Sequence, residues 1–292
     1  MTIELRGVSH TYPAAGAVHG PALHEIDLVI EDGEFVALIG PTGSGKSTLA
    51  QCLNGLIRPS AGQILVGGRD ITTDEARRDL RWLRRRVGMV FQFPEHQLFE
   101  ETVLADVSFG PKNLGLPPDE VAQRARRALT AVGLEDAELA KRSPFALSGG
   151  QMRRVAIAGV LAMEPEMLVL DEPAVGLDPR GREEILGQIE SLHRERGLTV
   201  VLISHNMEEV ARLAGRSLVL AEGRLVMDGP SGELFARGAE LRRLGLDVPV
   251  TVQVLELLRA GGWDVPASAG DTASTAAAIA AAAARRRGNG GR

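Results

Sequence analysis

The sequence predicts an α/β fold whose centre is a parallel β-sheet. Apolar runs of the kind that form buried strands lie at Glu34–Ile39, Met167–Leu170 and Thr199–Ile203. Helical patterns separate these runs, and alternating strands and helices favour a parallel sheet. A glycine-rich turn at Gly40–Thr48 follows the first run and opens a helix. We therefore expect one main α/β domain over residues 1–240.

An antiparallel β region is expected at the start of this domain. Short strand patterns occur at Ile3–Val8 and Leu23–Ile30, and Asp32–Gly33 is a turn signal of the hairpin type. A helix should then run from about Lys46 to Leu56, followed by a short strand at Gln63–Val66.

A helical subdomain is predicted between the phosphate loop and the acidic strand at Met167–Leu170, over about residues 93–163. The charged residues 75–86 are expected to be helical and to lead into a strand at Val87–Phe91. Within Asp119–Val132 the apolar residues recur on one helical face.

The last third of the chain should return to the α/β pattern and then leave it. A strand is expected at Ser217–Ala221 and a hairpin-like piece at Arg224–Met227. Residues 241–266 resemble a small helical extension. Residues 267–292 are rich in alanine, glycine and arginine and lack a core pattern, so we expect them to be disordered.

Composition places limits on the partners and the compartment. The chain has 292 residues, of which 44% are hydrophobic and 24% charged, with a formal net charge of −5 that does not favour nucleic acid. Cys52 is the single cysteine, which excludes an intramolecular disulfide and fits a reducing cytosol. No apolar stretch approaches the ~20 residues that span a bilayer. We therefore expect any membrane association to run through partner chains.

The motif GPTGSGKST matches the phosphate-loop pattern in full. Its residues are Gly40, Pro41, Thr42, Gly43, Ser44, Gly45, Lys46, Ser47 and Thr48. Glycines let backbone N–H groups converge on the phosphates, and the N-terminus of the following helix adds positive potential. Lys46 would neutralise the β and γ oxygens, and the Ser47 hydroxyl would coordinate Mg²⁺. The motif predicts a nucleoside triphosphate with Mg²⁺.

Two adjacent acids end the apolar run MLVL. Asp171 can hold Mg²⁺ through water, and Glu172 can polarise the water that attacks the terminal phosphate. Two acids at a strand end could also be ordinary loop charges. Behind a phosphate loop, the catalytic interpretation is favoured.

The motif LSGGQ at Leu147–Gln151 combines a helix cap with an anion site. Ser148 and Gln151 have the spacing of a capping box for a helix that runs to Leu161. Ser148 and the N–H groups of Gly149 and Gly150 could at the same time bind a γ-phosphate.

In this order the motifs resemble those of ATP-binding cassette (ABC) ATPases over about residues 2–245. The resemblance implies an ABC-type nucleotide-binding domain with a RecA-like parallel core, an N-terminal antiparallel β subdomain and an inserted helical subdomain. It also implies that ATP is the nucleotide. Because LSGGQ serves the nucleotide held by a partner subunit, it implies dimerisation driven by ATP.

The same resemblance implies roles for four more residues. His205 resembles the switch histidine that contacts the γ-phosphate and orients the water, although a lone histidine is more often structural. Gln92 resembles the glutamine that joins Mg²⁺ and reports to the membrane partner. Tyr12 falls where an aromatic ring stacks on adenine, unless it is ordinary surface packing. Asp178, in GLDP, resembles the aspartate of the loop that crosses the dimer interface.

Longer segments are similar to one subfamily, the ATPase subunits of energy-coupling factor transporters. They are Val90–Gly115, residues 143–165 and Gly245–Pro266. These membrane complexes import vitamins or transition-metal ions, and FPEHQLFEETV is similar to the second of their two paired ATPases. The resemblance implies a second ATPase (a heterodimer, with a homodimer as the alternative), a transmembrane scaffold subunit and a substrate-binding membrane subunit. It places the chain at the cytoplasmic face of the cell membrane.

Two details qualify the resemblance. The family usually has Thr-Ala before Gly-Leu-Asp, whereas this chain has Ala174 and Val175, so a hydroxyl near the dimer interface is missing. Acidic residues flank Leu98, Phe99 and Val103, which suits a groove for a basic coupling helix of the scaffold; these acids are Glu95, Glu100 and Glu101.

Three alternatives stay open at this point. The chain could be the ATPase of a conventional importer or exporter, or a non-hydrolysing regulatory subunit, against which Glu172 and His205 argue. It could also be a soluble ABC protein that acts on nucleic acid or ribosomes. The arginine-rich run between Arg77 and Arg86 would suit nucleic acid, but only Trp82 interleaves it, and a solvated helix face explains it better.

Overall fold

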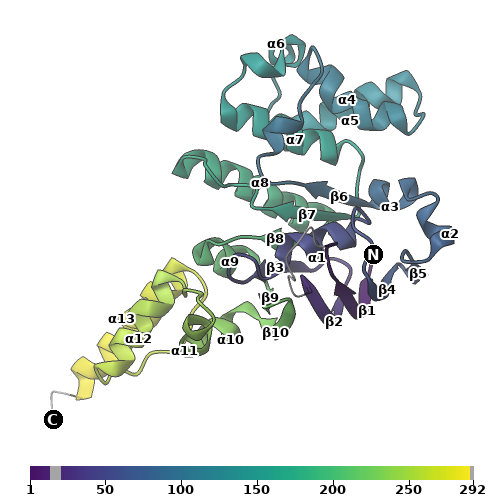
Figure 1. Cartoon of the computed structure of the whole chain (residues 1–292). Coiled ribbons are helices and arrows are strands. Elements are labelled where there is room, and N and C mark those ends of the chain that lie inside the picture. The colour runs from purple at the N-terminus through teal and green to yellow at the C-terminus, as the bar shows by residue number, and fades with distance from the viewer. Residues whose placement is uncertain (14–20, 290–292) are drawn as a thin grey trace. The chain divides into compact units, whose positions relative to one another are not determined.

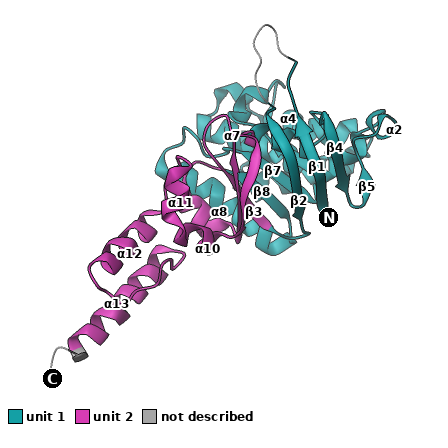
Figure 2. Cartoon of the chain, turned by 60° about the horizontal axis from the view of Figure 1, so that its bottom comes forward, with its two compact units in different colours: residues 1–34, 47–203 teal, residues 35–46, 204–292 magenta. Residues whose placement is uncertain are grey.

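The chain folds into two compact units, which Figure 2 colours separately. The computed structural model describes residues 1–13 and 21–289. Unit 1 comprises Met1–Glu34 and Ser47–Ile203, and unit 2 comprises Phe35–Lys46 and Ser204–Arg292. Figure 1 labels the helices and strands.

An antiparallel sheet opens unit 1, as predicted. Its strand order is β2-β1-β4-β5. The strands are β1 (Ile3–His10), β2 (Leu23–Ile30), β4 (Ala61–Val66) and β5 (Arg69–Asp70). Ile3 pairs with Ile30 on one side and with Val66 on the other. Alternate residues of β1 and β2 are buried, so one face of this sheet packs into the interior.

Parallel strands form the core of unit 1, in the order β8-β7-β6. They are β6 (Val87–Val90), β7 (Met167–Asp171) and β8 (Thr199–Ile203), and every residue in them is buried. Such continuous apolar runs are typical of parallel strands covered on both faces. Because the three strands are parallel, their carboxyl ends lie at one edge.

The other regular elements of unit 1 are helices. Their bounds are α1 (Lys46–Leu53, its first residue in unit 2), α2 (Asp74–Arg77), α3 (Arg81–Arg86), η1 (Pro94–Gln97), α4 (Val103–Asn113), α5 (Pro118–Ala131), α6 (Ala137–Lys141), η2 (Pro144–Ala146), α7 (Gly149–Leu161) and α8 (Pro179–Arg196). Helix α4 packs against α5 and α7, which is the predicted helical subdomain. The single helix expected over residues 75–86 is instead two short helices, because the chain leaves helical geometry between Arg78 and Leu80.

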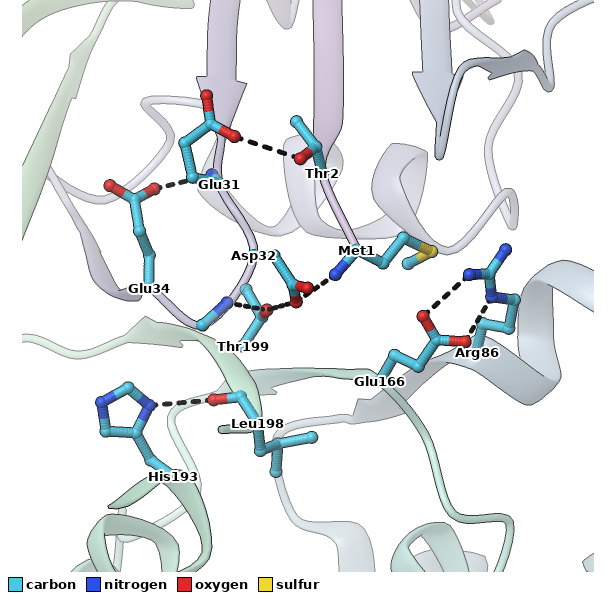
Figure 3. Close-up of polar contacts among 11 residues, drawn as sticks. Met1, Thr2, Glu31, Asp32, Glu34, Arg86, Glu166, His193, Leu198 and Thr199 are labelled. Atoms are coloured by element: carbon cyan, nitrogen blue, oxygen red, sulfur yellow. Dashed lines mark hydrogen bonds and ion pairs between the residues drawn. The ribbon is translucent and has the colours of Figure 1, made fainter. Parts of the chain in front are cut away.

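A polar network joins the start of the antiparallel sheet to the amino ends of the parallel strands (Figure 3). The Gly33 N–H donates to the Thr199 hydroxyl at 2.9 Å, and that hydroxyl donates to Asp32 at 3.4 Å. The amino group of Met1 pairs with the same carboxylate. Nearby, Arg86 makes two hydrogen bonds to Glu166, at 2.5 and 2.8 Å. The hairpin-type turn predicted at Asp32–Gly33 is therefore hydrogen-bonded to Thr199, the first residue of β8.

Unit 2 contains a second set of strands, in the order β10-β9-β3. Strand β3 (Phe35–Ile39) pairs in parallel with β9 (Arg216–Ala221), and β10 (Arg224–Pro230) returns antiparallel to β9. Helix α9 (Met207–Leu213) precedes β9, and α10 (Ser231–Ala236) and α11 (Gly238–Arg243) follow β10. The hairpin expected at Arg224–Met227 is confirmed and extends to Pro230.

The prediction of disorder was wrong for residues 272–289, which form helix α13 (Thr272–Asn289). This helix packs against α12 (Val250–Ala260) through a small apolar cluster that contains Leu255, Val265 and Ala282, with Trp263 and Ile279 at its side. A sequence of alanines gave no periodic signal, yet small side chains allow two helices to approach closely. Arg286 also lies over the Trp263 ring, 5.2 Å from its centre. Residues 290–292 lie outside the described residues.

Across residues 1–13 and 21–289, no helix combines the length and the apolar character that crossing a membrane requires.

Candidate functional site

The phosphate loop of unit 2 has the backbone that its glycines predict. Gly40 has φ +155°, and a Cβ there would lie 2.2 Å from the carbonyl oxygen of Leu220, so only glycine fits. The buried Lys46 ammonium donates to the carbonyls of Gly40 and Pro41, at 2.8 and 2.9 Å. Its charge is thereby held over the turn between β3 and α1.

Two of the predicted residues, Tyr12 and Thr48, meet at the start of α1 within unit 1. The Tyr12 and Thr48 hydroxyls are 3.1 Å apart, and the Tyr12 ring is 50% exposed. His10 packs edge-on against that ring, with 4.6 Å between centroids. Ser47 is exposed beside them. Tyr12 thus has a hydrogen-bonded hydroxyl and is half exposed, so that a planar base could reach its ring.

Gln92 and Glu172 meet at the carboxyl edge of β6 and β7. Val90 pairs with Leu170, so the residues two positions beyond are also level with each other. The Gln92 amide donates to the Glu172 carboxylate at 3.3 Å. The Glu172 N–H bonds the Ile203 carbonyl at 3.1 Å, and the residue has φ +51°, in the left-handed region. Asp171 is the last residue of β7 and is buried.

Two other predicted residues cap helices in unit 1. Ser148 and Gln151 form both halves of a capping box at the start of α7. The Gly181 N–H donates to the Asp178 carboxylate at 2.8 Å, which caps α8. Ser148, Gly149 and Asp178 are exposed.

His205 lies exposed in the turn before α9 of unit 2. A hydrogen-bonded frame surrounds it: the Ser204 hydroxyl donates to Glu209 at 2.7 Å and accepts from the Asn206 N–H at 3.0 Å. Asn206 then caps α9 through the N–H groups of Glu208 and Glu209. His205 therefore lies in a turn that these hydrogen bonds hold.

Sequence reasoning missed the buried ion pair between Arg153 and Glu95. Arg153 is 3% exposed and donates to both carboxylate oxygens of Glu95, at 2.7 and 3.0 Å. Burial has the largest single effect and raises the pKa of Glu95. The hydrogen bonds from Arg153, a backbone hydrogen bond and the charges of Arg153 and His96 together outweigh it, so the pKa falls below its usual value. The signal available in the sequence was the arginine two positions after LSGGQ, on a helix with apolar neighbours.

No cluster of three or more histidine, cysteine or acidic side chains suited to a metal ion occurs within the part of the chain that the structure describes. The residues predicted for Mg²⁺ are a hydroxyl, an amide and a carboxylate, from Ser47, Gln92 and Asp171. All three offer oxygen, which Mg²⁺ prefers, and Mg²⁺ takes most of its other ligands from water and phosphate. The donor set therefore fits this ion.

These features define an ATPase of the ABC class. The family model described as "ABC transporter" matches residues 23–175. Among solved structures, the post-hydrolysis dimer of the ATP-binding cassette MJ0796, bound to ADP and Pi, aligns with a TM-score of 0.70 at 30% identity, over 78% of this chain and 98% of that one. The cbiO1 protein of Clostridium perfringens, part of the ABC transporter complex cbiONQ, aligns with a TM-score of 0.72 at 37% identity, over 87% and 98%.

Relatives of known type identify the subfamily of ABC ATPases to which the chain belongs. The energy-coupling factor transporter ATP-binding protein EcfA2 of Symbiobacterium thermophilum is 53% identical over 266 residues, 91% of each chain. The EcfA2 protein of Clostridium tetani is 47% identical over 265 residues, again 91% of each. The chain therefore belongs to the ABC transporter ATPases and, within them, to the EcfA2-type ATP-binding subunits of energy-coupling factor transporters.

Proposed function

We propose that this chain binds ATP with Mg²⁺, closes on a second ATPase subunit and hydrolyses the nucleotide to drive a vitamin or transition-metal importer at the cytoplasmic face of the cell membrane. The observation that carries the catalytic part is the Gln92–Glu172 hydrogen bond at the edge of β6 and β7. It brings an amide, which can sense a metal ion, against a carboxylate that can polarise water.

Each residue is proposed to have a separate task in the reaction. Lys46 neutralises the β and γ oxygens, and the N–H groups of Gly40–Thr48 hold the phosphates. Tyr12 stacks on adenine through its open face. Glu172 polarises the attacking water while His205 contacts the γ-phosphate and orients that water.

Bound Mg²⁺ would supply positive charge that offsets the negative charge developing on the phosphates. Ser47 and Gln92 are proposed to ligate it directly, and Asp171 to hold it through water. The carboxylate of Asp171 is buried at the end of a strand, so its position is fixed by the sheet. A fixed carboxylate favours a metal in one place.

The partner ATPase is proposed to complete each nucleotide site. Ser148 and the N–H groups of Gly149 and Gly150 lie at an exposed helix N-terminus, a suitable donor set for the γ-phosphate of the nucleotide on the other subunit. Asp178 then lies in the loop that crosses the interface. The MJ0796 cassette was solved as a dimer bound to ADP and Pi, which supports pairing of two ATPase subunits. A heterodimer is our proposal here, and a homodimer is the alternative outcome.

A groove in unit 1 is proposed to receive the scaffold subunit. It is lined by residues of β6, η1, α4 and α7, including Leu98, Phe99, Phe109 and Met163. Phe99 and Phe109 pack edge to face at 4.8 Å and stay 57% and 43% exposed. Glu100 and Glu101 follow Phe99 in the chain, so an apolar helix face with arginines at its rim would match the groove.

Two experiments test these proposals. Hydrolysis should be lost in Glu172→Gln while ATP binding persists; retained hydrolysis would show that Glu172 takes no part in the reaction.

The double variant Glu100→Lys, Glu101→Lys should release the membrane subunits from a detergent pull-down while ATP binding is unchanged. Glu195→Lys, on the exposed part of α8, is the matched control. Membrane subunits that stay bound to the double variant would exclude the groove.

A further inference from the structure

Arg153 of α7 reaches two loops that leave adjacent strands. Its guanidinium bonds the Glu95 carboxylate in the loop after β6, at 2.7 and 3.0 Å. The same side chain donates to the carbonyls of Pro173, at 3.3 Å, and Val175 in the loop after β7. A planar guanidinium with donors in fixed directions can hold both loops at once.

Both loops begin in strained backbone. Phe93, directly after Gln92, has φ +55°, and Glu172 itself has φ +51°. Side chains other than glycine adopt these values only where the surroundings hold them. Arg153 lies over the Phe93 ring, 5.9 Å from its centre, and bonds the carbonyl of the residue after Glu172. It is therefore in contact with the backbone or ring that follows each member of the Gln92–Glu172 pair.

We propose that Arg153 is a positioning residue, which sets the distance and orientation of Gln92 relative to Glu172 by holding both of their loops. This proposal rests on the catalytic roles proposed above for that pair. In this role Arg153 is not required to touch the nucleotide or the attacking water. The residue acts through Glu95 on one side and through main-chain carbonyls on the other.

The position of Arg153 in α7 indicates how the partner's nucleotide could affect the two loops. Helix α7 begins at the Ser148 cap, and Arg153 follows five positions later, just over one turn along. A shift of α7 when Ser148 engages the nucleotide of the partner would move both loops together. The contacts to the second loop use carbonyl oxygens, so the departure at Ala174 and Val175 leaves them in place.

Because the Arg153–Glu95 ion pair is buried, loss of either residue should be costly. Arg153 is 3% exposed and the Glu95 side chain 16%. Removing one partner would leave the other as an uncompensated charge in the interior. The two loops would then relax from their strained backbone, and the amide and the carboxylate would separate.

The test compares Arg153→Met with Arg154→Met in the complex with the second ATPase. Arg154 is the next residue of α7 and is also paired, with Glu184 of α8 at 3.1 Å, so it matches the truncation without contacting either loop. In Arg153→Met, kcat should fall about 10- to 100-fold while KM and ATP affinity stay within about twofold. Arg153→Lys should recover part of kcat, and Arg154→Met should match the wild type.

A second readout separates positioning from general damage. Amide hydrogen exchange should rise in residues 90–98 and in residues 172–178 together in Arg153→Met, while β7 stays protected. Should that variant fail to fold, Glu95→Gln, which keeps an acceptor, should still lower kcat and raise exchange in both segments. A wild-type kcat, an equal loss in Arg154→Met, or a loss confined to KM would each overturn the proposal.

The Glu172→Gln variant separates failure of the proposed catalytic site from failure of the positioning role of Arg153. If that variant hydrolyses ATP normally, the proposed site is wrong and the inference falls with it. If it is inactive while Arg153→Met is fully active, the site stands and only the role of Arg153 is wrong.

Discussion

The strand-end loops of unit 1 and the C-terminal helix pair of unit 2 are held in place by different means. The loops after β6 and β7 combine left-handed backbone at Phe93 and Glu172 with a buried ion pair. Helices α12 and α13 meet through a small apolar cluster around Leu255 and Ala282. Strain and buried charge occur where chemistry is proposed, whereas the helix pair has neither. Left-handed backbone also occurs at Glu25, Glu164 and Glu222, so strain alone does not mark a functional region. What sets the strand-end loops apart is that strain and a buried ion pair occur together next to the Gln92–Glu172 pair.

The largest effect that we expect comes from Gly40→Ala, in the phosphate loop. The new methyl group would lie 2.2 Å from the Leu220 carbonyl oxygen. Such overpacking should lower the free energy of unfolding by about 3 kcal/mol or more. Gly43→Ala is the control, because it has φ +80° with nothing within 4 Å, and should cost only about 1 kcal/mol. Urea unfolding measures both, and equal losses would contradict the close approach at Gly40.

The next effect tests whether α13 is docked. Ala282 is 4% exposed inside the apolar cluster, whereas the neighbouring Ala281 is exposed. Ala282→Asp should weaken the α12–α13 contact by about 2–3 kcal/mol, since it buries a carboxylate without a partner. Hydrogen exchange across residues 250–265 should rise in that variant and stay low in Ala281→Asp. Identical exchange in the two variants would mean that α13 is undocked, as the sequence suggests.

A smaller effect should appear in the pH dependence of stability. The pKa of Glu95 is lowered from its usual 4.5 in the folded protein. Its stabilising contribution is therefore complete above pH 4.5 and is lost as the pH falls through the folded pKa. The stability difference between the wild type and Glu95→Gln should be constant at neutral pH and shrink below pH 4.5, in urea titrations. A difference that grows on acidification would contradict the paired charge.

The smallest effect concerns Cys52, in α1. Burial raises the pKa of its thiol to about 12. The thiolate is the reactive form, so alkylation at pH 8 should be negligible in the folded protein and fast once urea unfolds it. Labelling is followed by mass spectrometry. Rapid labelling of the folded chain would show that α1 opens locally.

Much of the fold could be predicted because buried strands leave a strong local signal. Leu23–Ile30 and Thr199–Ile203 were predicted to the residue. The phosphate loop was identifiable because its glycines are required by backbone geometry. The roles assigned to Tyr12, Gln92 and His205 stay predictions, although the structure pairs Gln92 with Glu172.

The rest depended on contacts between distant parts of the chain. Glu95 and Arg153 are 58 residues apart, and nothing local in either segment indicates that the two charges meet. Helix α13 lacks a periodic apolar face, so its docking depends on Trp263 and Val265 of the preceding loop. In both cases the residues that determine the contact lie outside the segment whose sequence pattern gave the prediction.

The backbone of Glu172 has a consequence for how the sequence can vary. A residue with positive φ gives up about 1 kcal/mol of stability relative to glycine at the same place. A glycine there would relieve this strain but, under the proposed chemistry, would be unable to turn over the nucleotide. Under that chemistry, turnover keeps a carboxylate at a position whose backbone favours glycine.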